Sequence, residues 1–258
     1  MKNNLHITIV SNSITWDCVQ FNLEKIEHQL EGQEPSDLIV LPEMFATGFI
    51  VDDSLPSPTD SVRILEWMQQ LSQKSGAAVT GSVAVCDNDL WYNRLYFVTP
   101  EGGIMHYDKR HLFPLSPEAQ FYQPGTELPI FEYKGWRICP QICYDLRFPK
   151  FCRNEYANGE YKYDILLYVA NWPAARAETW NTLLRARAIE NQSYVIACNC
   201  VGEDPRKCFY QGDSQIVDPS GSIHIKQDAG KHSVIQSQLS ATELERIRRV
   251  FPFAKDAD

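Results

Sequence analysis

RICPQICYDLRFP, residues 137–149, is the segment around which the rest of the chain is arranged. An apolar, strand-like run ends at Cys143, and the charged stretch that follows, up to Pro149, is suited to a helix start. The Tyr144 N–H would then lie at a helix entrance, where unpaired amides and the helix dipole favour negative charge and lower the pKa of a thiol. This pattern indicates a cysteine nucleophile, although a cysteine on such a strand also fits a small buried core residue.

The composition of the chain limits both its class and its partners. With 258 residues, 44% of them hydrophobic and 12% aromatic, the chain can bury a large core and is not a disordered sequence. Its formal net charge is −9 and its 24 lysines and arginines are scattered, which argues against a nucleic-acid partner because phosphate binding needs clustered cations. No apolar run approaches the roughly 20 residues that cross a bilayer, and the N-terminus shows no signal-peptide pattern. We therefore expect a cytoplasmic protein without a membrane segment.

The eight cysteines predict reduced thiols rather than a disulfide framework, because the chain is long and lacks a secretion signal. A zinc site is the alternative, and its nearest candidate ligands are Cys198, Cys200 and Cys208. The sequence has no Cys-x-x-Cys pair, and Cys198 and Cys200 alternate within a strand-like run. We accordingly expect no metal.

Hydrophobic periodicity predicts helices and strands along most of the chain. Helical spacing predicts helices over 19–30, 61–74, 176–191 and 241–249. Gly76 is suited to cap the end of the second, and Ser240 with Glu243 forms a capping box before the fourth. Apolar or alternating runs predict strands over 5–10, 37–41, 77–85, 90–98, 104–109, 131–133, 136–142, 164–171, 194–201, 215–217, 223–225 and 234–239.

The order of these elements indicates the architecture. Strand-helix-strand-helix is followed by several strands and then by strand-helix-strand, and two sheets packed face to face with helices on both outer sides would bury all of them. Residues 111–125 are rich in proline and aromatic side chains without either period, which is typical of a lid or binding loop and equally of a long connection. No low-complexity linker divides the chain, so we predict one α/β domain over residues 1–258.

Three reactive side chains fall at the ends of strand-like runs: Glu43, Lys109 and Cys143. Each alone also fits an ordinary surface or turn residue. Together they are chemically coherent, because a thiol that attacks an amide needs a base, an anion stabiliser and an acid for the leaving group. Glu43 could take and return the proton of Cys143, while Lys109 and the Tyr144 N–H hold the oxyanion.

These residues lie in segments that resemble the three signatures of the nitrilase, or carbon-nitrogen hydrolase, superfamily, in the same order and with similar spacing. The segments are LPEMF (41–45), YDKRHLF (107–113) and ICYDLRFP (142–149). Further matches are ANWP (170–173), RARAIENQ (185–192), GDS (212–214) and DPSG (218–221). The resemblance covers essentially the whole chain.

The resemblance implies a four-layer α-β-β-α sandwich, a Glu-Lys-Cys triad, no metal or organic cofactor and, commonly, a homodimer. By the match of segments, Glu43 resembles the general base, Lys109 the oxyanion stabiliser and Cys143 the nucleophile. Glu118 matches a second family glutamate that orients the lysine and contacts the substrate.

Within the superfamily, PEMFATGF (42–49) and ANWPAAR (170–176) look most like bacterial ω-amidases of the Nit2-like type. That branch hydrolyses the terminal amide of 2-oxo acid monoamides such as 2-oxoglutaramate and 2-oxosuccinamate. Such a substrate needs a cation away from the triad, and Arg176 is the first candidate. Arg147 is the second, although it equally fits a structural ion pair. Further residues expected at the substrate site are Phe49, Tyr122, Tyr144, Asn171 and Trp172.

A small-molecule amide is thus the expected partner, and two alternatives stay open. The same triad could act on a nitrile, an N-carbamoyl compound or another small amide. Alternatively, the chain could be a non-catalytic binding module on the same fold, against which the intact Glu43, Lys109 and Cys143 argue.

Overall fold

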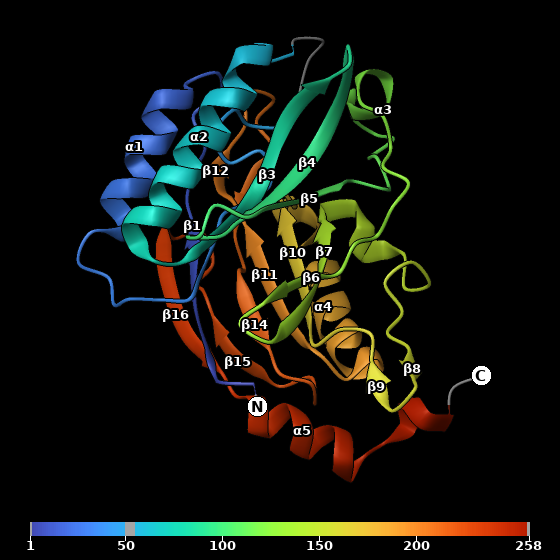
Figure 1. The fold of residues 1–258 in the computed structure, drawn as a ribbon. Coiled ribbons are helices and arrows are strands. Elements are labelled where there is room, and N and C mark those ends of the chain that lie inside the picture. Colours follow the sequence, from blue (N-terminus) through green and yellow to red (C-terminus); the bar gives the residue numbers. More distant parts are fainter. Residues whose placement is uncertain (1, 50–54, 257–258) are drawn as a thin grey trace.

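The computed structural model describes residues 2–49 and 55–256, and these form two six-stranded sheets (Figure 1). The strands of the first sheet are β1 (Leu5–Ser11), β2 (Leu38–Val40), β3 (Ala78–Asp87), β4 (Leu90–Val98), β5 (Ile104–Asp108) and β16 (Ser233–Leu239). The strands of the second are β6 (Phe131–Tyr133), β7 (Trp136–Ile142), β10 (Ile165–Ala170), β11 (Tyr194–Asn199), β14 (Gln215–Val217) and β15 (Ile223–Lys226).

Both sheets have a parallel centre and antiparallel edges. The strand orders are β16-β1-β2-β3-β4-β5 and β15-β14-β11-β10-β7-β6, in which β1, β2 and β3 run parallel, as do β7, β10 and β11. The central strands β2 and β10 are buried along their whole length, which is why their sequences are continuous apolar runs. Because parallel strands end at one edge of a sheet, the residues that follow β2, β7 and β10 can meet at one end of the molecule.

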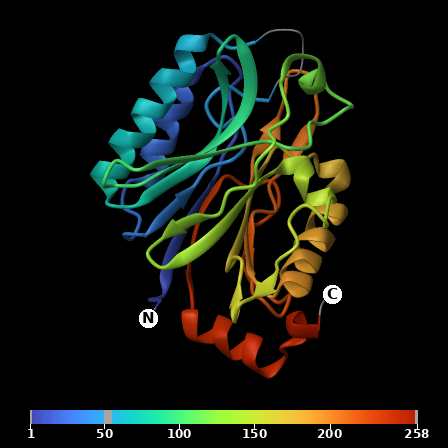
Figure 2. The same cartoon turned by 45° about the vertical axis from the view of Figure 1, so that its right-hand side comes forward.

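The main core lies between the sheets, and smaller cores lie outside them. Apolar side chains of both sheets form one cluster, to which Leu5, Val40, Ile138 and Leu167 belong. Helices α1 (Val19–Leu30) and α2 (Pro58–Ser75) cover the outer face of the first sheet, and α4 (Ala177–Asn191) covers that of the second (Figure 2). The predicted four-layer α-β-β-α sandwich is therefore confirmed. No helix in the described ranges is both long and apolar enough to cross a membrane.

The last helix departs from two expectations. Helix α5 (Ala241–Val250) does not cover an outer face but lies across one end of the sandwich, where Ala241 and Leu244 join the core between the sheets (Figure 1). Its predicted capping box is only half formed. The Ser240 side chain accepts from the Glu243 N–H at 3.2 Å, but the Glu243 carboxylate binds Arg246 instead.

Several short elements were not predicted. The strand predicted over 194–201 is interrupted at Cys200, because the chain leaves the second sheet and Val201 bridges to Ser13. It continues as β12 (Val201–Glu203), which pairs with β13 (Phe209–Gln211) in a hairpin. The remaining short elements are β8 (Tyr156–Ala157), β9 (Glu160–Tyr161), α3 (Glu118–Phe121) and the single 3₁₀ turns η1 (Cys143–Arg147), η2 (Ala174–Arg176) and η3 (Phe253–Asp256).

Candidate active site

The residues that follow four strands meet at one end of the sandwich. Glu43 follows β2, Lys109 follows β5, Cys143 follows β7 and Asn171 follows β10. Hydrogen bonds join the two sheets here: the Asn171 N–H donates to Glu43 Oε2 and the Asn171 side-chain amide donates to the Glu43 carbonyl, each at 2.8 Å. The strand-end positions inferred from sequence are therefore brought together in space.

A buried ammonium group lies between two carboxylates. Lys109 Nζ is 2.8 Å from Glu43 Oε1 and 2.9 Å from both carboxylate oxygens of Glu118. The Asn93 side-chain amide of β4 donates to Glu43 Oε1 at 2.8 Å and to Glu118 Oε1 at 2.9 Å. The Phe113 N–H also donates to Glu118 Oε2, at 2.7 Å, so both carboxylates are fixed by several donors.

The charges in this cluster shift one another's pKa values. Burial alone would lower the pKa of Lys109, but the charges of Glu118 and Glu43 outweigh it and raise that pKa, so Lys109 stays protonated. Burial raises the pKa of Glu118, which Lys109 opposes and the neighbouring Glu43 reinforces. Two carboxylates thus share one cation in a site closed to water.

Cys143 occupies a strained corner beside this cluster. Its φ of 47° lies in the left-handed region, which costs a residue other than glycine about 1–3 kcal/mol. Burial and then the charge of Glu43 raise the pKa of the thiol well above its usual value, although Lys109 opposes them, and a hydrogen bond to Glu43 adds to the rise. The predicted lowering of the thiol pKa is therefore wrong. The 3₁₀ turn η1 has only five residues, and its weak dipole acts against burial and a neighbouring carboxylate.

Cys143 lines a cavity of about 250 Å³. Seven of the residues considered for the site line this cavity: Phe49, Cys143, Tyr144, Arg147, Asn171, Trp172 and Arg176. Glu43, Lys109 and Glu118 are fully or almost fully buried and do not belong to the described lining. Lys109 Nζ lies 5.3 Å from the centre of the Phe49 ring, and Phe49 lines the cavity.

Two arginines of the cavity are held by aromatic rings. The Arg147 guanidinium lies 5.1 Å from the centre of the Trp172 ring, and that of Arg176 lies 5.4 Å from the Phe113 ring. The structural ion pair considered for Arg147 is not formed with Asp145, whose carboxylate accepts instead from Tyr107, His111 and Ile142. Both guanidinium groups therefore keep donors for a ligand.

Tyr122 does not wall the cavity. It is buried in an apolar cluster with Met44 and Phe49, and it is absent from the cavity lining within the described residues. Burial and the nearby charges of Glu118 and Glu43 raise the pKa of its hydroxyl. Tyr122 thus supports Phe49 from the interior of the protein.

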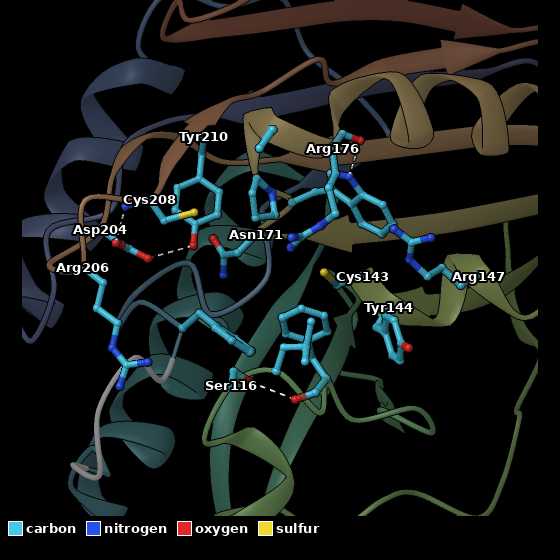
Figure 3. Close-up of a pocket in the computed structure, with 16 residues that line it drawn as sticks. Ser116, Cys143, Tyr144, Arg147, Asn171, Arg176, Asp204, Arg206, Cys208 and Tyr210 are labelled. Carbon is cyan, nitrogen blue, oxygen red and sulfur yellow. Dashed lines mark hydrogen bonds between the residues drawn. The ribbon is translucent and has the colours of Figure 1, made fainter.

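The far end of the cavity was missed by sequence reasoning. Figure 3 shows Asp204, Arg206, Cys208 and Tyr210 at one end and Tyr144 and Arg147 at the other, with Cys143 between them. These four residues belong to β13 and to the turn that joins it to β12. Asp204 is fixed by the Cys208 N–H at 2.9 Å and the Tyr210 hydroxyl at 3.0 Å. Asn93 was also missed, and its only signal was a polar residue inside an apolar strand.

The three cysteines considered for zinc lie in different environments. Cys198 belongs to the core between the sheets, whereas Cys200 and Cys208 pack in a separate small cluster with Tyr210. Over residues 2–49 and 55–256, no three His, Cys, Asp or Glu side chains are grouped so that they could hold a metal ion.

Comparisons with known proteins match the chain along nearly its whole length. The model of the carbon-nitrogen hydrolase family matches residues 7–249. The chain is 43% identical to the omega-amidase YafV of Escherichia coli over 254 residues, which cover 98% of this chain and 97% of that protein. It is 34% identical to the 2-oxoglutaramate amidase of Bacillus subtilis, over 94% of this chain and 96% of that protein.

A solved structure agrees with these matches. The fold superposes with a TM-score of 0.91 on a CN-hydrolase superfamily protein from Xanthomonas campestris that carries an arsenic adduct in its active site. That protein is 40% identical to this one, and the match covers 99% of this chain and 98% of the other. Both the sequence and the fold therefore place this chain in the carbon-nitrogen hydrolase family, the nitrilase superfamily, to which it belongs.

Proposed function

We propose that this protein hydrolyses the terminal amide of a small 2-oxo acid monoamide, either 2-oxoglutaramate or 2-oxosuccinamate, to the 2-oxo dicarboxylate and ammonia. The observation that carries the proposal is the juxtaposition of Cys143, which lines the cavity, with the buried Glu43, Lys109 and Glu118. The relatives named omega-amidase and 2-oxoglutaramate amidase support the choice of substrate.

The first half of the proposed reaction forms a thioester. Because the pKa of Cys143 is raised, the thiol is neutral at rest, and Glu43 accepts its proton as sulfur attacks the amide carbon. Lys109 Nζ has three N–H donors and three carboxylate acceptors, one on Glu43 and two on Glu118. In the proposed mechanism one N–H serves both oxygens of Glu118 and a second serves Glu43, so that the third turns to the oxyanion beside the Tyr144 N–H. Glu43 then returns the proton to the nitrogen, the carbon–nitrogen bond breaks and ammonia leaves.

The second half releases the acid. Glu43 accepts a proton from a water molecule as that water attacks the thioester carbon, and the same two donors hold the second oxyanion. The carbon–sulfur bond breaks, and the proton returns from Glu43 to Cys143. Glu118 acts through Lys109, because its carboxylate holds the ammonium group in place at 2.9 Å and keeps it charged.

The substrate's carboxylate is assigned to the arginines of the cavity. Arg176 is the first candidate and Arg147 the second, since both line the cavity and neither guanidinium is bound to a carboxylate among the described residues. Arginine binds carboxylates through two parallel hydrogen bonds, which fixes the orientation of the chain that leads to the amide. Asn171 and Trp172 complete the wall on that side.

A panel of substrates tests the proposal. We expect ammonia release from 2-oxoglutaramate and 2-oxosuccinamate at a kcat/KM at least about 100-fold above that for glutamine, asparagine, an aliphatic nitrile and an N-carbamoyl amino acid. The nitrile lacks a carboxylate for the arginines, and the α-ammonium group of glutamine or asparagine would lie next to the same two cations. Preferred hydrolysis of the nitrile or the carbamoyl compound would replace this proposal with the corresponding alternative. No turnover of any compound would favour a binding module.

We also propose three properties of the whole protein. A single domain over 1–258 is supported by the core that both sheets share. A cytoplasmic location is supported by the eight cysteines, which are all free, because disulfides are rare in reducing compartments. A homodimer is supported by apolar side chains that are exposed near the C-terminal end, Val250, Phe251 and Phe253, and sedimentation would test it.

A further inference from the structure

The Asp145 carboxylate is a buried acceptor that the proposed mechanism does not use. It is fully buried, two residues after Cys143, and it accepts three hydrogen bonds and lies within hydrogen-bond distance of the His111 ring. Its Oδ1 atom accepts from the His111 N–H at 3.0 Å and lies 2.7 Å from His111 Nδ1. Its Oδ2 atom accepts from the Tyr107 hydroxyl at 2.7 Å and from the Ile142 N–H at 3.0 Å.

These donors come from the two segments that carry the nucleophile and the oxyanion stabiliser. Tyr107 and His111 stand two residues before and two residues after Lys109, and Ile142 directly precedes Cys143. The Tyr107 hydroxyl also accepts from the Arg110 N–H at 3.0 Å, so the side chain of Tyr107 before Lys109 and the backbone after it are both tied to this carboxylate. Asp145 therefore joins the end of a strand in the first sheet to the end of a strand in the second.

The same carboxylate closes the corner at Cys143. The bond from the Ile142 N–H to Asp145 Oδ2 spans the nucleophile, whose φ of 47° is sparsely populated for a residue with a side chain. Such a conformation persists only where surrounding contacts fix it. The direction of the Tyr144 N–H depends on the same corner, because Tyr144 lies between Cys143 and Asp145.

We propose that Asp145 is a positioning residue, which holds the Cys143 corner in register with Lys109 so that the thiol and the Tyr144 N–H face the same point as the ammonium group. This inference rests on the proposed function. Misplacing a reacting group by about 1 Å can lower a rate about 100-fold, so the effect should fall on the chemical step rather than on binding.

The geometry also explains why an amide could not replace this carboxylate. Each of its oxygens faces one backbone N–H, of His111 on one side and of Ile142 on the other, and neither donor can turn away. An asparagine side chain has a single acceptor oxygen, so in either orientation its NH₂ group would oppose a buried N–H. The Asp145→Asn variant keeps the size of the side chain and removes this double acceptance together with the negative charge.

The experiment compares Asp145→Asn with Asp164→Asn, a matched control. Asp164 is equally buried and hydrogen-bonded but precedes β10, at the opposite end from the site. For Asp145→Asn we expect kcat on 2-oxoglutaramate to fall about 100-fold per folded molecule, with KM within about threefold of wild type. We expect iodoacetamide to label Cys143, followed by peptide mass, at least about 10-fold more slowly. Asp164→Asn should change neither value.

Wild-type kcat and labelling rate in a folded Asp145→Asn variant would overturn the proposal, as would equal losses in the two variants. If wild type releases no ammonia, the proposed function fails, but the labelling comparison still tests the position of Cys143.

If Asp145→Asn does not fold, Tyr107→Phe replaces it, because it removes one donor to Asp145. An unchanged kcat in Tyr107→Phe would then contradict the proposal, and a loss of about 3- to 10-fold at constant KM would support it.

Discussion

The two ends of strand β10 carry buried ionic clusters of opposite balance. Before the strand, the single carboxylate of Asp164 meets three cations: Lys2 at 2.5 Å, Arg248 at 2.8 Å and Arg137 at 3.5 Å. Beyond its end, about 20 Å away along the strand, two carboxylates and a thiol share the single ammonium group of Lys109.

The pKa shifts at the two ends have opposite directions. Burial raises the pKa of Asp164, but the bonds and charges of Lys2 and Arg248 outweigh it and leave that pKa lowered. At the other end burial raises the pKa values of Glu118 and Cys143, and one cation is not enough to reverse either rise. A surplus of cations thus lowers the pKa of a buried carboxylate, whereas a surplus of acidic groups keeps a thiol protonated beside Glu43, the base of the proposed mechanism.

Removing the shared cation should produce the largest effect. In Lys109→Met the two carboxylates lose their cationic partner among the described residues, and the oxyanion of the proposed mechanism loses a donor. We expect kcat to fall at least about 1,000-fold in an ammonia-release assay, and the free energy of unfolding in urea to fall by about 3–5 kcal/mol. Activity within tenfold of wild type would mean that the ammonium group does not stabilise the oxyanion.

Removing one negative charge at constant shape should have a smaller effect. Glu118→Gln keeps the size of the side chain but offers one acceptor oxygen to Lys109 and Phe113, where the carboxylate offers two. We expect kcat to fall about 100-fold while KM changes less than about threefold, measured on 2-oxoglutaramate. Asp164→Asn is the control, and an equal loss in it would show that any buried carboxylate matters alike.

Replacing an arginine of the cavity should weaken substrate binding and leave the chemical step nearly unchanged. Arg176→Gln removes a charge that lies over the Phe113 ring and donates to no described carboxylate. We expect KM for 2-oxoglutaramate to rise about 10- to 100-fold with kcat within about threefold. Arg246→Gln, on the exposed side of α5, is the matched control. A KM within twofold of wild type would move the carboxylate site to Arg147.

The cluster of Asp164 with its three cations should make the stability of the protein depend on pH. The pKa of Asp164 is lowered by folding from an ordinary 3.8, so its contribution is present above pH 3.8 and is lost as the pH falls through the folded value. We expect Asp164→Asn to lower the free energy of unfolding by about 2 kcal/mol at pH 7, and the difference from wild type to shrink below about pH 3.8. A difference that does not change with pH would contradict this assignment.

The parts of the molecule that follow local pattern could be predicted. Apolar runs identified the central strands, and Gly76, with its φ of 69°, ends α2 as expected. Glu43, Lys109 and Cys143 could be found because each reactive residue ends such a run in a segment that resembles a family signature. The direction of the thiol's pKa shift could not, since it depends on burial and on a carboxylate 100 residues away in sequence.

The parts that depend on long-range contacts were missed. The hairpin that carries Asp204 and Arg206 reaches the cavity because Val201 leaves its sheet to meet Ser13, and no local pattern marks that crossing. Tyr122 lies in a proline-rich segment next to Glu118, yet its ring turns into the interior rather than to the cavity. Arg147 follows Asp145 by two residues but contacts a ring of another segment, Trp172.

The central claim is that the neutral thiol of Cys143 attacks the substrate and that Glu43, beside it, accepts its proton. Removing the thiol tests this claim most directly. We would measure ammonia release from 2-oxoglutaramate by Cys143→Ala beside Cys86→Ala, a thiol outside the cavity that controls for the loss of any cysteine. We predict that Cys143→Ala keeps the fold, by circular dichroism and thermal unfolding, and releases no ammonia above the blank, while Cys86→Ala matches wild type. Ammonia release by a folded Cys143→Ala variant at the wild-type rate would contradict the account.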